Sequence, residues 1–226
     1  MTIQHHLGDD LLASYAAGGT DEATGLLVAT HLALCPACRT AVAAFEAVGG
    51  AIMAGCEPAD LNAGAFAALE ARLGRAEPGS SVPPASPAPA FAPAAPYAAA
   101  PTIPQPLRSY LVGPLDRLRW QRVGPGVRRV PLRVGGGATA RLLELAPGLK
   151  LPRHGHTASE LTLVLSGGYS DESGRFARGD VEEATPEDVH RPITDPDGPC
   201  LCLVVTTGAL RFTGLTARLL QPFIRL

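Results

Sequence analysis

A stretch rich in proline and alanine, from Pro78 to Pro106, constrains this chain more than any other feature. Prolines recur through it with small residues between them. Such a segment cannot bury a core, and it favours solvated polyproline II. At ~3.1 Å per residue it reaches on the order of 90 Å when extended, so it can join two domains and let them separate widely. We therefore expect a multidomain chain with a first domain over residues 1–75, a linker over 76–106 and a second domain over 107–226.

The parts on either side of the linker differ in charge. Residues 1–75 carry eight acidic side chains against three arginines, a net charge of −5, and the rest of the chain carries +3. A small acidic domain suits a basic protein partner better than DNA. No apolar run approaches the ~20 residues that cross a bilayer, and the N-terminus MTIQHHLGDD lacks the pattern of a secretory signal. We expect a cytoplasmic protein with no membrane contact and no direct nucleic-acid contact.

Residues 1–75 have the apolar spacing of short helices. The first follows the acidic pair Asp9-Asp10 and ends at Gly18-Gly19, and the second begins near Asp21 and reaches Pro36. The third begins near residue 37, and Asp60 is the expected N-cap of a fourth that ends at residue 74. Four short helices form a small bundle with a thin core. A domain of this size often needs a metal as a staple.

The segment HLALCPAC contains a compact set of zinc ligands. His31 and Cys35 lie one helical turn apart, and Cys38 follows at a Cys-x-x-Cys spacing. Structural zinc takes four ligands, and His5 and His6 are the other histidines of this part. The alternatives are a chance helix surface and a redox Cys-x-x-Cys, but the βαβ context of the redox motif is missing. The pattern therefore favours a structural zinc site.

The C-terminal part changes to a period of two with turn signals, which indicates an all-β domain, closed or sandwiched. The expected strands are separated by clusters of glycine, proline and aspartate. They cover residues 127–134, 138–145, 161–165, 201–206, 210–213 and 219–226.

A second set of ligands lies at the start of this β domain. His154 and His156 point to the same face of a strand, Glu160 follows across a turn, and His190 is the remaining histidine of this part. Three imidazoles and a carboxylate suit a divalent metal such as Zn, Fe, Mn or Ni. The alternative is an ordinary pair of exposed strand histidines.

Cys200 and Cys202 fall on one face of an apolar strand. They are either small core residues or, if that face looks into the barrel, thiols close to the metal.

Both ligand sets resemble known families. The His-x-x-x-Cys-x-x-Cys pattern with a histidine about 25 residues upstream resembles the bacterial zinc anti-sigma domain, and this resemblance implies His6 as the fourth ligand. Gly148, His154, His156, Glu160 and Gly167 match the first cupin motif, which implies a small metal-containing β-barrel. The second cupin motif is degraded, since Asp188 stands where a glycine is usual.

The combination of a zinc anti-sigma domain, a proline-rich linker and a cupin resembles the ChrR family of cupin anti-sigma factors. The resemblance implies that residues 1–75 bind and inhibit an extracytoplasmic-function sigma factor, and that the cupin receives a signal related to singlet oxygen or similar oxidants. It implies no enzyme activity. The main rival hypothesis is a cupin metalloenzyme, a dioxygenase, isomerase or hydrolase with a helical accessory domain. A DNA-binding regulator is disfavoured because the helical part is acidic.

Overall fold

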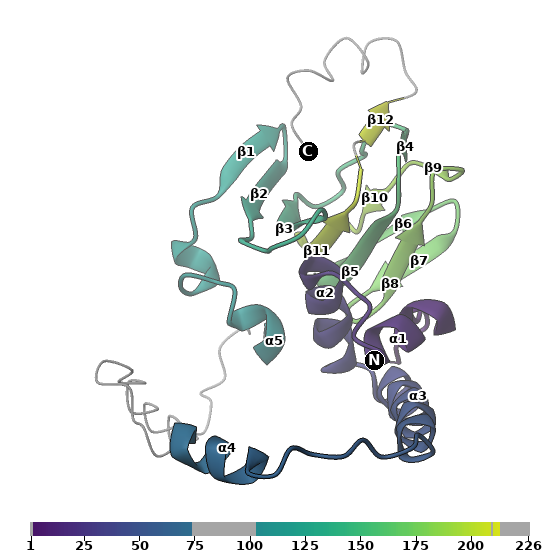
Figure 1. Ribbon diagram of the computed structural model, residues 1–226. Helices are drawn as coiled ribbons and strands as arrows, with labels where there is room; N and C mark the ends of the chain where they lie inside the picture. Colours follow the sequence, from purple (N-terminus) through teal and green to yellow (C-terminus); the bar gives the residue numbers. More distant parts are fainter. Residues whose placement is uncertain (1, 74–102, 209, 213–226) are drawn as a thin grey trace. The chain divides into compact units, whose positions relative to one another are not determined.

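The computed structural model describes residues 2–73, 103–208 and 210–212 (Figure 1). Contacts divide the chain into two compact units, one of residues 1–50 and 101–226 and one of residues 51–100. Most of the expected linker lies outside the described residues. The domain limits at residues 75 and 106 therefore stay predictions.

The expected helices are present in the N-terminal part, with one corrected boundary. Asp21 caps the second helix, because its carboxylate accepts a hydrogen bond from the Thr24 N–H at 3.1 Å. Asp60 was the wrong N-cap: the fourth helix begins at Ala65, directly after Gly64, whose φ of 93° cannot continue a helix. The helices are α1 (Asp9–Ala16), α2 (Glu22–Leu32), α3 (Pro36–Ala54), α4 (Ala65–Leu73) and the short α5 (Gln105–Arg108), followed by the 3₁₀ turn η1 (Leu115–Arg117).

The C-terminal part is an antiparallel β structure of three sheets, which confirms the expected all-β class. Its strands are β1 (Gln121–Gly124), β2 (Val127–Pro131), β3 (Thr139–Leu145), β4 (His154–His156), β5 (Glu160–Ser166), β6 (Gly168–Asp171), β7 (Gly174–Ala177), β8 (Val181–Ala184), β9 (Val189–His190), β10 (Ile193–Thr194), β11 (Cys200–Thr206) and β12 (Leu210–Phe212). The sheets have the orders β1-β2-β3-β11-β5-β8, β10-β6-β7 and β12-β4-β9. The strand expected over residues 219–226 lies outside the described residues.

The centre of the large sheet, at β5 and β11, is buried on both faces. All seven residues of β11 are buried, which agrees with its unbroken apolar sequence. On the inner face Val204 pairs with Arg141 of β3 and with Thr162 of β5. On the outer face Leu203 pairs with Leu142 and Leu163.

Helix α2 covers the outer face of this sheet (Figure 1). Leu26 and Leu27 of α2 belong to one hydrophobic cluster with Leu142, Leu163 and Leu203 of the sheet. The linker predicts two parts that can separate widely. In the described residues of the first unit, the N-terminal helices and the β domain instead share a core.

Residues 3–8, the N-terminal segment, lie against the turn before β8. The N–H groups of Gln4 and His5 donate to Asp180 Oδ1 at 2.7 and 3.0 Å, and the Val181 N–H donates to the His5 carbonyl at 3.2 Å. Gly179 has a φ of 96°, and a Cβ there would lie 2.7 Å from Ile3. Only glycine fits this position. Its missing side chain lets the N-terminal segment approach the β domain closely.

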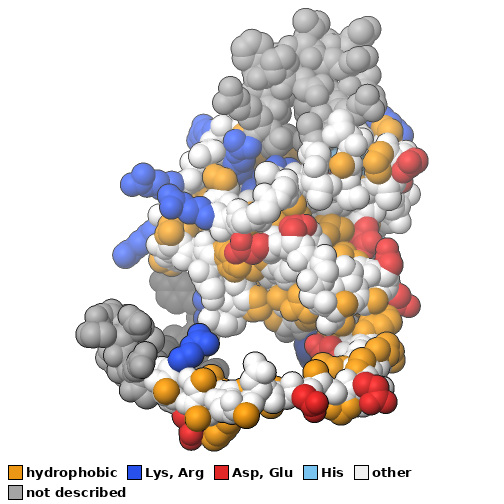
Figure 2. Space-filling model, viewed as in Figure 1, with side chains coloured by type: hydrophobic (Ala, Val, Ile, Leu, Met, Phe, Trp, Pro, Cys, Tyr) orange, Lys and Arg blue, Asp and Glu red, His pale blue; other side chains and the backbone are white. Residues whose placement is uncertain are grey.

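Most of helix α3 is exposed or only partly buried, and its buried residues are Cys38 and Val42. Hydrophobic side chains show on the surface over α3 (Figure 2), and Ile52 and Met53 are 68% and 75% exposed. By length and composition alone the helix could span a bilayer, although Arg39 and Glu46 interrupt it. Helices of soluble proteins pass the same test, so this finding is weak support for a membrane span.

Candidate metal sites

The structure brings His6, His31, Cys35 and Cys38 together in one cluster. Their ligand atoms all lie within 4.8 Å of one another. His31 Nε2 is 3.2 Å from the Cys38 sulfur, and His6 Nδ1 lies 3.3 and 3.5 Å from the sulfurs of Cys35 and Cys38. A tetrahedral zinc ion with its usual bond lengths separates nitrogen and sulfur ligands by ~3.5 Å, so this donor set fits zinc.

Each histidine of this cluster presents one nitrogen to the thiols. The His31 Nδ1–H donates to the Gly179 carbonyl at 2.9 Å, which leaves Nε2 free to bind a cation. Burial lowers the pKa of His31, and burial together with Cys35 raises the pKa of Cys38 to about 11. Without a cation the Cys38 thiol therefore stays protonated, whereas a bound cation favours its thiolate.

The three sheets of the β domain, the barrel, bring together the second predicted set, His154, His156, Glu160 and His190, which we call the barrel cluster. Their ligand atoms also lie within 4.8 Å of one another. His190 Nε2 is 3.2 Å from His154 Nε2 and 3.3 Å from His156 Nε2. Nitrogen ligands of a tetrahedral zinc ion are ~3.3 Å apart, so the spacing fits a first-row divalent cation. Strand register brings these two histidines together, because β4 pairs with β9 and places His154 opposite His190.

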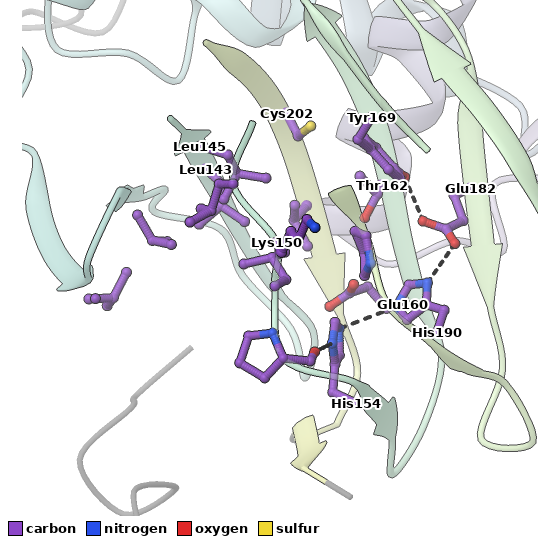
Figure 3. Close-up of a pocket in the computed structure, with 18 of the residues that line it drawn as sticks. Leu143, Leu145, Lys150, His154, Glu160, Thr162, Tyr169, Glu182, His190 and Cys202 are labelled. Atoms are coloured by element: carbon purple, nitrogen blue, oxygen red, sulfur yellow. Dashed lines mark hydrogen bonds and ion pairs between the residues drawn. The ribbon is translucent and has the colours of Figure 1, made fainter. Parts of the chain in front are cut away.

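Two carboxylates and a phenol orient His190, and the sequence did not point to them. The His190 Nδ1–H lies 2.8 Å from Glu182 Oε1 and 2.9 Å from Asp171 Oδ2. The Tyr169 hydroxyl donates to the other oxygen of Glu182 at 2.5 Å (Figure 3). These contacts direct Nε2 toward the cluster, as carboxylates behind ligating histidines commonly do. Glu182 lies in the segment GDVEEATPEDVH, but nothing in that segment distinguishes it from Glu183 beyond strand alternation.

The electrostatics separate His190 from the other two histidines. Burial lowers the pKa values of His154 and His156 to about 4, so both imidazoles are neutral near pH 7. Burial also opposes protonation of His190, but Glu182 and Asp171 outweigh it and raise its pKa to about 9. The His154 Nδ1–H donates to the Pro152 carbonyl at 2.9 Å, and its Nε2 lies within the cluster, 3.2 Å from His190 Nε2. The cluster thus offers neutral nitrogen donors from β4, as transition metals require.

Cys200 and Cys202 are both buried, with their sulfurs 3.5 Å apart. Cys202 lines the cavity beside the barrel cluster (Figure 3). The contact with Cys200 and, next, burial raise the pKa of Cys202 well above its ordinary value. The Cys202 thiol therefore stays protonated at neutral pH, which makes it a poor nucleophile.

An antiparallel β domain with an inward His/Glu cluster and a helical region with a His/Cys cluster define a cupin-like protein with a helical region that can hold a metal. The sequence matches the ChrR cupin-like domain family over residues 109–210. Over all 226 residues, and over 100% of both chains, it is 43% identical to the anti-sigma-E factor ChrR of Cereibacter sphaeroides. The chain belongs to the ChrR family.

A solved structure resembles this one over both regions. It is the crystal structure of Rhodobacter sphaeroides SigE in complex with the anti-sigma ChrR, with a TM-score of 0.73 and 40% identity. The match covers 91% of this chain and 99% of that chain. The predicted family and fold class are thus confirmed.

Proposed function

We propose that this chain is a cytoplasmic anti-sigma factor that binds and inhibits an extracytoplasmic-function sigma factor. The observation that carries the proposal is the full-length similarity to a protein whose complex with SigE is solved. The likeness spans both ligand clusters, so it supports the function of the whole chain.

Exposed apolar side chains supply a surface for such a partner. Ile52 and Met53 on α3, and Phe66 and Leu73 on α4, are each at least two-thirds exposed. Larger exposed apolar patches mark interaction sites, and side chains of this kind anchor protein interfaces. The acidic balance of residues 1–75 complements a basic partner.

We assign zinc to the cluster of His6, His31, Cys35 and Cys38, where it would have a structural role. Two thiolates and two imidazoles form a closed tetrahedral set, and a bound zinc contributes directly to folding free energy. The set His154, His156, Glu160 and His190 would hold Zn or another divalent metal such as Fe, Mn or Ni. We propose that this second site receives an oxidant-related signal and does not support turnover.

A short segment of the barrel offers a route between the two clusters. Gly179 accepts the hydrogen bond of the zinc ligand His31, and Asp180 fastens the N-terminal segment that carries His6. Two residues further on, Glu182 accepts the hydrogen bond of His190. A change at the barrel cluster that moves this segment would therefore disturb two ligands of the zinc cluster. We propose that inhibition is released along this route.

A transcription assay tests the proposed function. The sigma factor would be one from the same organism, with one encoded by an adjacent gene as the first choice. The full chain should inhibit transcription from a promoter that depends on this sigma factor. Ile52→Asp with Met53→Asp should weaken inhibition, whereas the matched control Val112→Asp, at a residue 94% exposed elsewhere, should not. No inhibition by the unmodified chain, together with turnover of a small substrate, would favour the metalloenzyme hypothesis.

A further inference from the structure

The interior of the barrel contains a cavity of about 310 Å³ directly beside the barrel cluster (Figure 3). This volume lies at the lower end of the ~300–1,000 Å³ found for small-molecule sites. Its walls are mainly apolar and include Val127, Leu143, Leu145 and Val204. One part of the lining is formed by the ligand set, since His154, Glu160 and His190 face the same space. The cavity therefore combines a long apolar wall with one polar end.

The polar end also contains a buried cation. Arg141 is 9% exposed and lines the cavity, in register with Val204 and Thr162 of the inner face. In the described part of the chain, its guanidinium donates to the Thr206 hydroxyl at 3.3 Å, and its nearest carboxylate oxygen, on Glu160, is 3.9 Å away. A guanidinium has five N–H donors, and a buried one needs acceptors for them. Among the described residues, the guanidinium of Arg141 thus has fewer hydrogen-bond acceptors than donors.

A second cation lies on the lining. Lys150 is the single lysine of the chain, is exposed, and lines the cavity between its apolar wall and the cluster (Figure 3). The acidic groups of the lining are engaged elsewhere: Glu182 accepts from Tyr169 and His190, and Glu160 belongs to the ligand set. The positive charges of Arg141 and Lys150 therefore favour an anionic ligand in the cavity.

We propose that this cavity binds a small amphipathic carboxylate. The carboxylate accepts hydrogen bonds from Arg141 at the polar end, and the apolar body lies along Leu143 and Leu145. These residues follow Arg141 on β3, and the four residue steps from Arg141 to Leu145 span ~13 Å at ~3.3 Å per residue. That length suits a medium-chain acyl group. The regulatory meaning of the ligand rests on the proposed sensing function, but its binding is measured without a sigma factor.

Calorimetric titration of the full, metal-loaded chain tests the proposal with three probes that share one apolar chain: decanoate, decanol and decylamine. All are used below their micelle-forming concentrations. Decanoate should bind at least ~10-fold more tightly than decanol, a difference of about 1.4 kcal/mol, and decylamine should bind weakest. Arg141→Gln should reduce the affinity for decanoate to that for decanol. The matched control Arg122→Gln, at an exposed position on β1 outside the cavity, should leave it unchanged.

Three results would overturn the proposal: equal affinities for decanoate and decanol, an unchanged affinity for decanoate in Arg141→Gln, or no binding of any probe. If Arg141→Gln does not fold, the comparison of the three probes on the unmodified chain still decides. A chain that inhibits its sigma factor but does not bind decanoate contradicts only this inference. A chain that binds decanoate but inhibits no sigma factor contradicts only the proposed function.

Discussion

Replacing Asp180 with alanine tests how firmly the barrel supports the cluster of His6, His31, Cys35 and Cys38, the thiol cluster. Asp180 is 3% exposed, and its carboxylate accepts three backbone hydrogen bonds, from Gln4, His5 and Ala177. The first two fasten the N-terminal segment, on which the ligand His6 follows directly. The substitution removes all three bonds without touching a ligand.

The magnitude follows from the kind of bond that is lost. A hydrogen bond to a charged group contributes ~1.5–3 kcal/mol. Because Gln4 is exposed and His5 partly so, their freed N–H groups regain water, and the lower value applies. Two such bonds give about 3 kcal/mol, and full transfer of this loss to metal binding corresponds to roughly 100-fold in affinity. We expect a decrease of about 10- to 100-fold.

Cobalt is the suitable probe, because cobalt–thiolate absorption reports only the cluster that contains cysteines. Cobalt affinity is measured by competition with a chelator for the unmodified chain, Asp180→Ala and the control Asp197→Ala, whose side chain is exposed. Asp180→Ala should bind cobalt more weakly, and the control should match the unmodified chain. Equal affinities in all three would refute the claim that the barrel supports this cluster.

Further outcomes are expected at both clusters and with pH. Cys38→Ser should abolish the cobalt–thiolate absorption and lower the helical circular dichroism signal, and an unchanged signal would contradict a structural role for zinc. Glu182→Gln should weaken metal binding in the barrel ~10- to 100-fold without changing the cobalt–thiolate absorption, since it orients only His190. Glu160→Ala should keep sigma-factor inhibition but prevent oxidant-triggered release in cells, and normal release would contradict sensing at this site. Burial of Asp180 opposes ionisation, but its backbone hydrogen bonds lower its pKa below 3.8, so its stabilising contribution is present above that pH and lost below it. In urea unfolding of the metal-free chain, the stability difference between the unmodified chain and Asp180→Ala should therefore shrink as the pH falls below 3.8, and a constant difference would contradict this assignment.

Local spacing predicted the closely spaced members of each ligand set, but His6 came from the family resemblance, and His190 was taken as the remaining histidine of its part. His154 and His156 share a strand face, and Cys35 and Cys38 lie about one helical turn apart. The carboxylates behind His190 could not be predicted in the same way. Asp171 and Glu182 come from different strands, and only the folded barrel brings them to one imidazole nitrogen.

The contact between the helices and the β domain was also beyond sequence reasoning, although one signal was present. A strand with one face in solvent alternates apolar and polar side chains, but the β11 sequence CLCLVVT is apolar at both sets of alternate positions up to Thr206. That pattern requires cover on both faces. The proline-rich linker pointed instead to separable domains, but a linker constrains only reach and does not exclude docking.

Strand β8 explains why the two clusters should respond to each other. Side chains alternate along a strand, so Glu182 points inward to His190, while the neighbouring Glu183 accepts a hydrogen bond from the Gly8 N–H of the N-terminal segment at 2.9 Å. One face of β8 thus contacts the barrel cluster, and its other face contacts the N-terminal segment that carries His6 of the thiol cluster. Suppose that metal bound at the barrel cluster changes the metal affinity of the thiol cluster by some factor. Linkage then requires that metal bound at the thiol cluster changes the metal affinity of the barrel cluster by the same factor. Measuring barrel affinity with the thiol cluster filled and with it disabled by Cys38→Ser gives one factor, and the cobalt–thiolate titration with the barrel filled or disabled by Glu160→Ala gives the other. Two equal factors different from one would establish coupling through β8 and its neighbours, whereas two factors of one would show that the clusters are independent despite their shared strand.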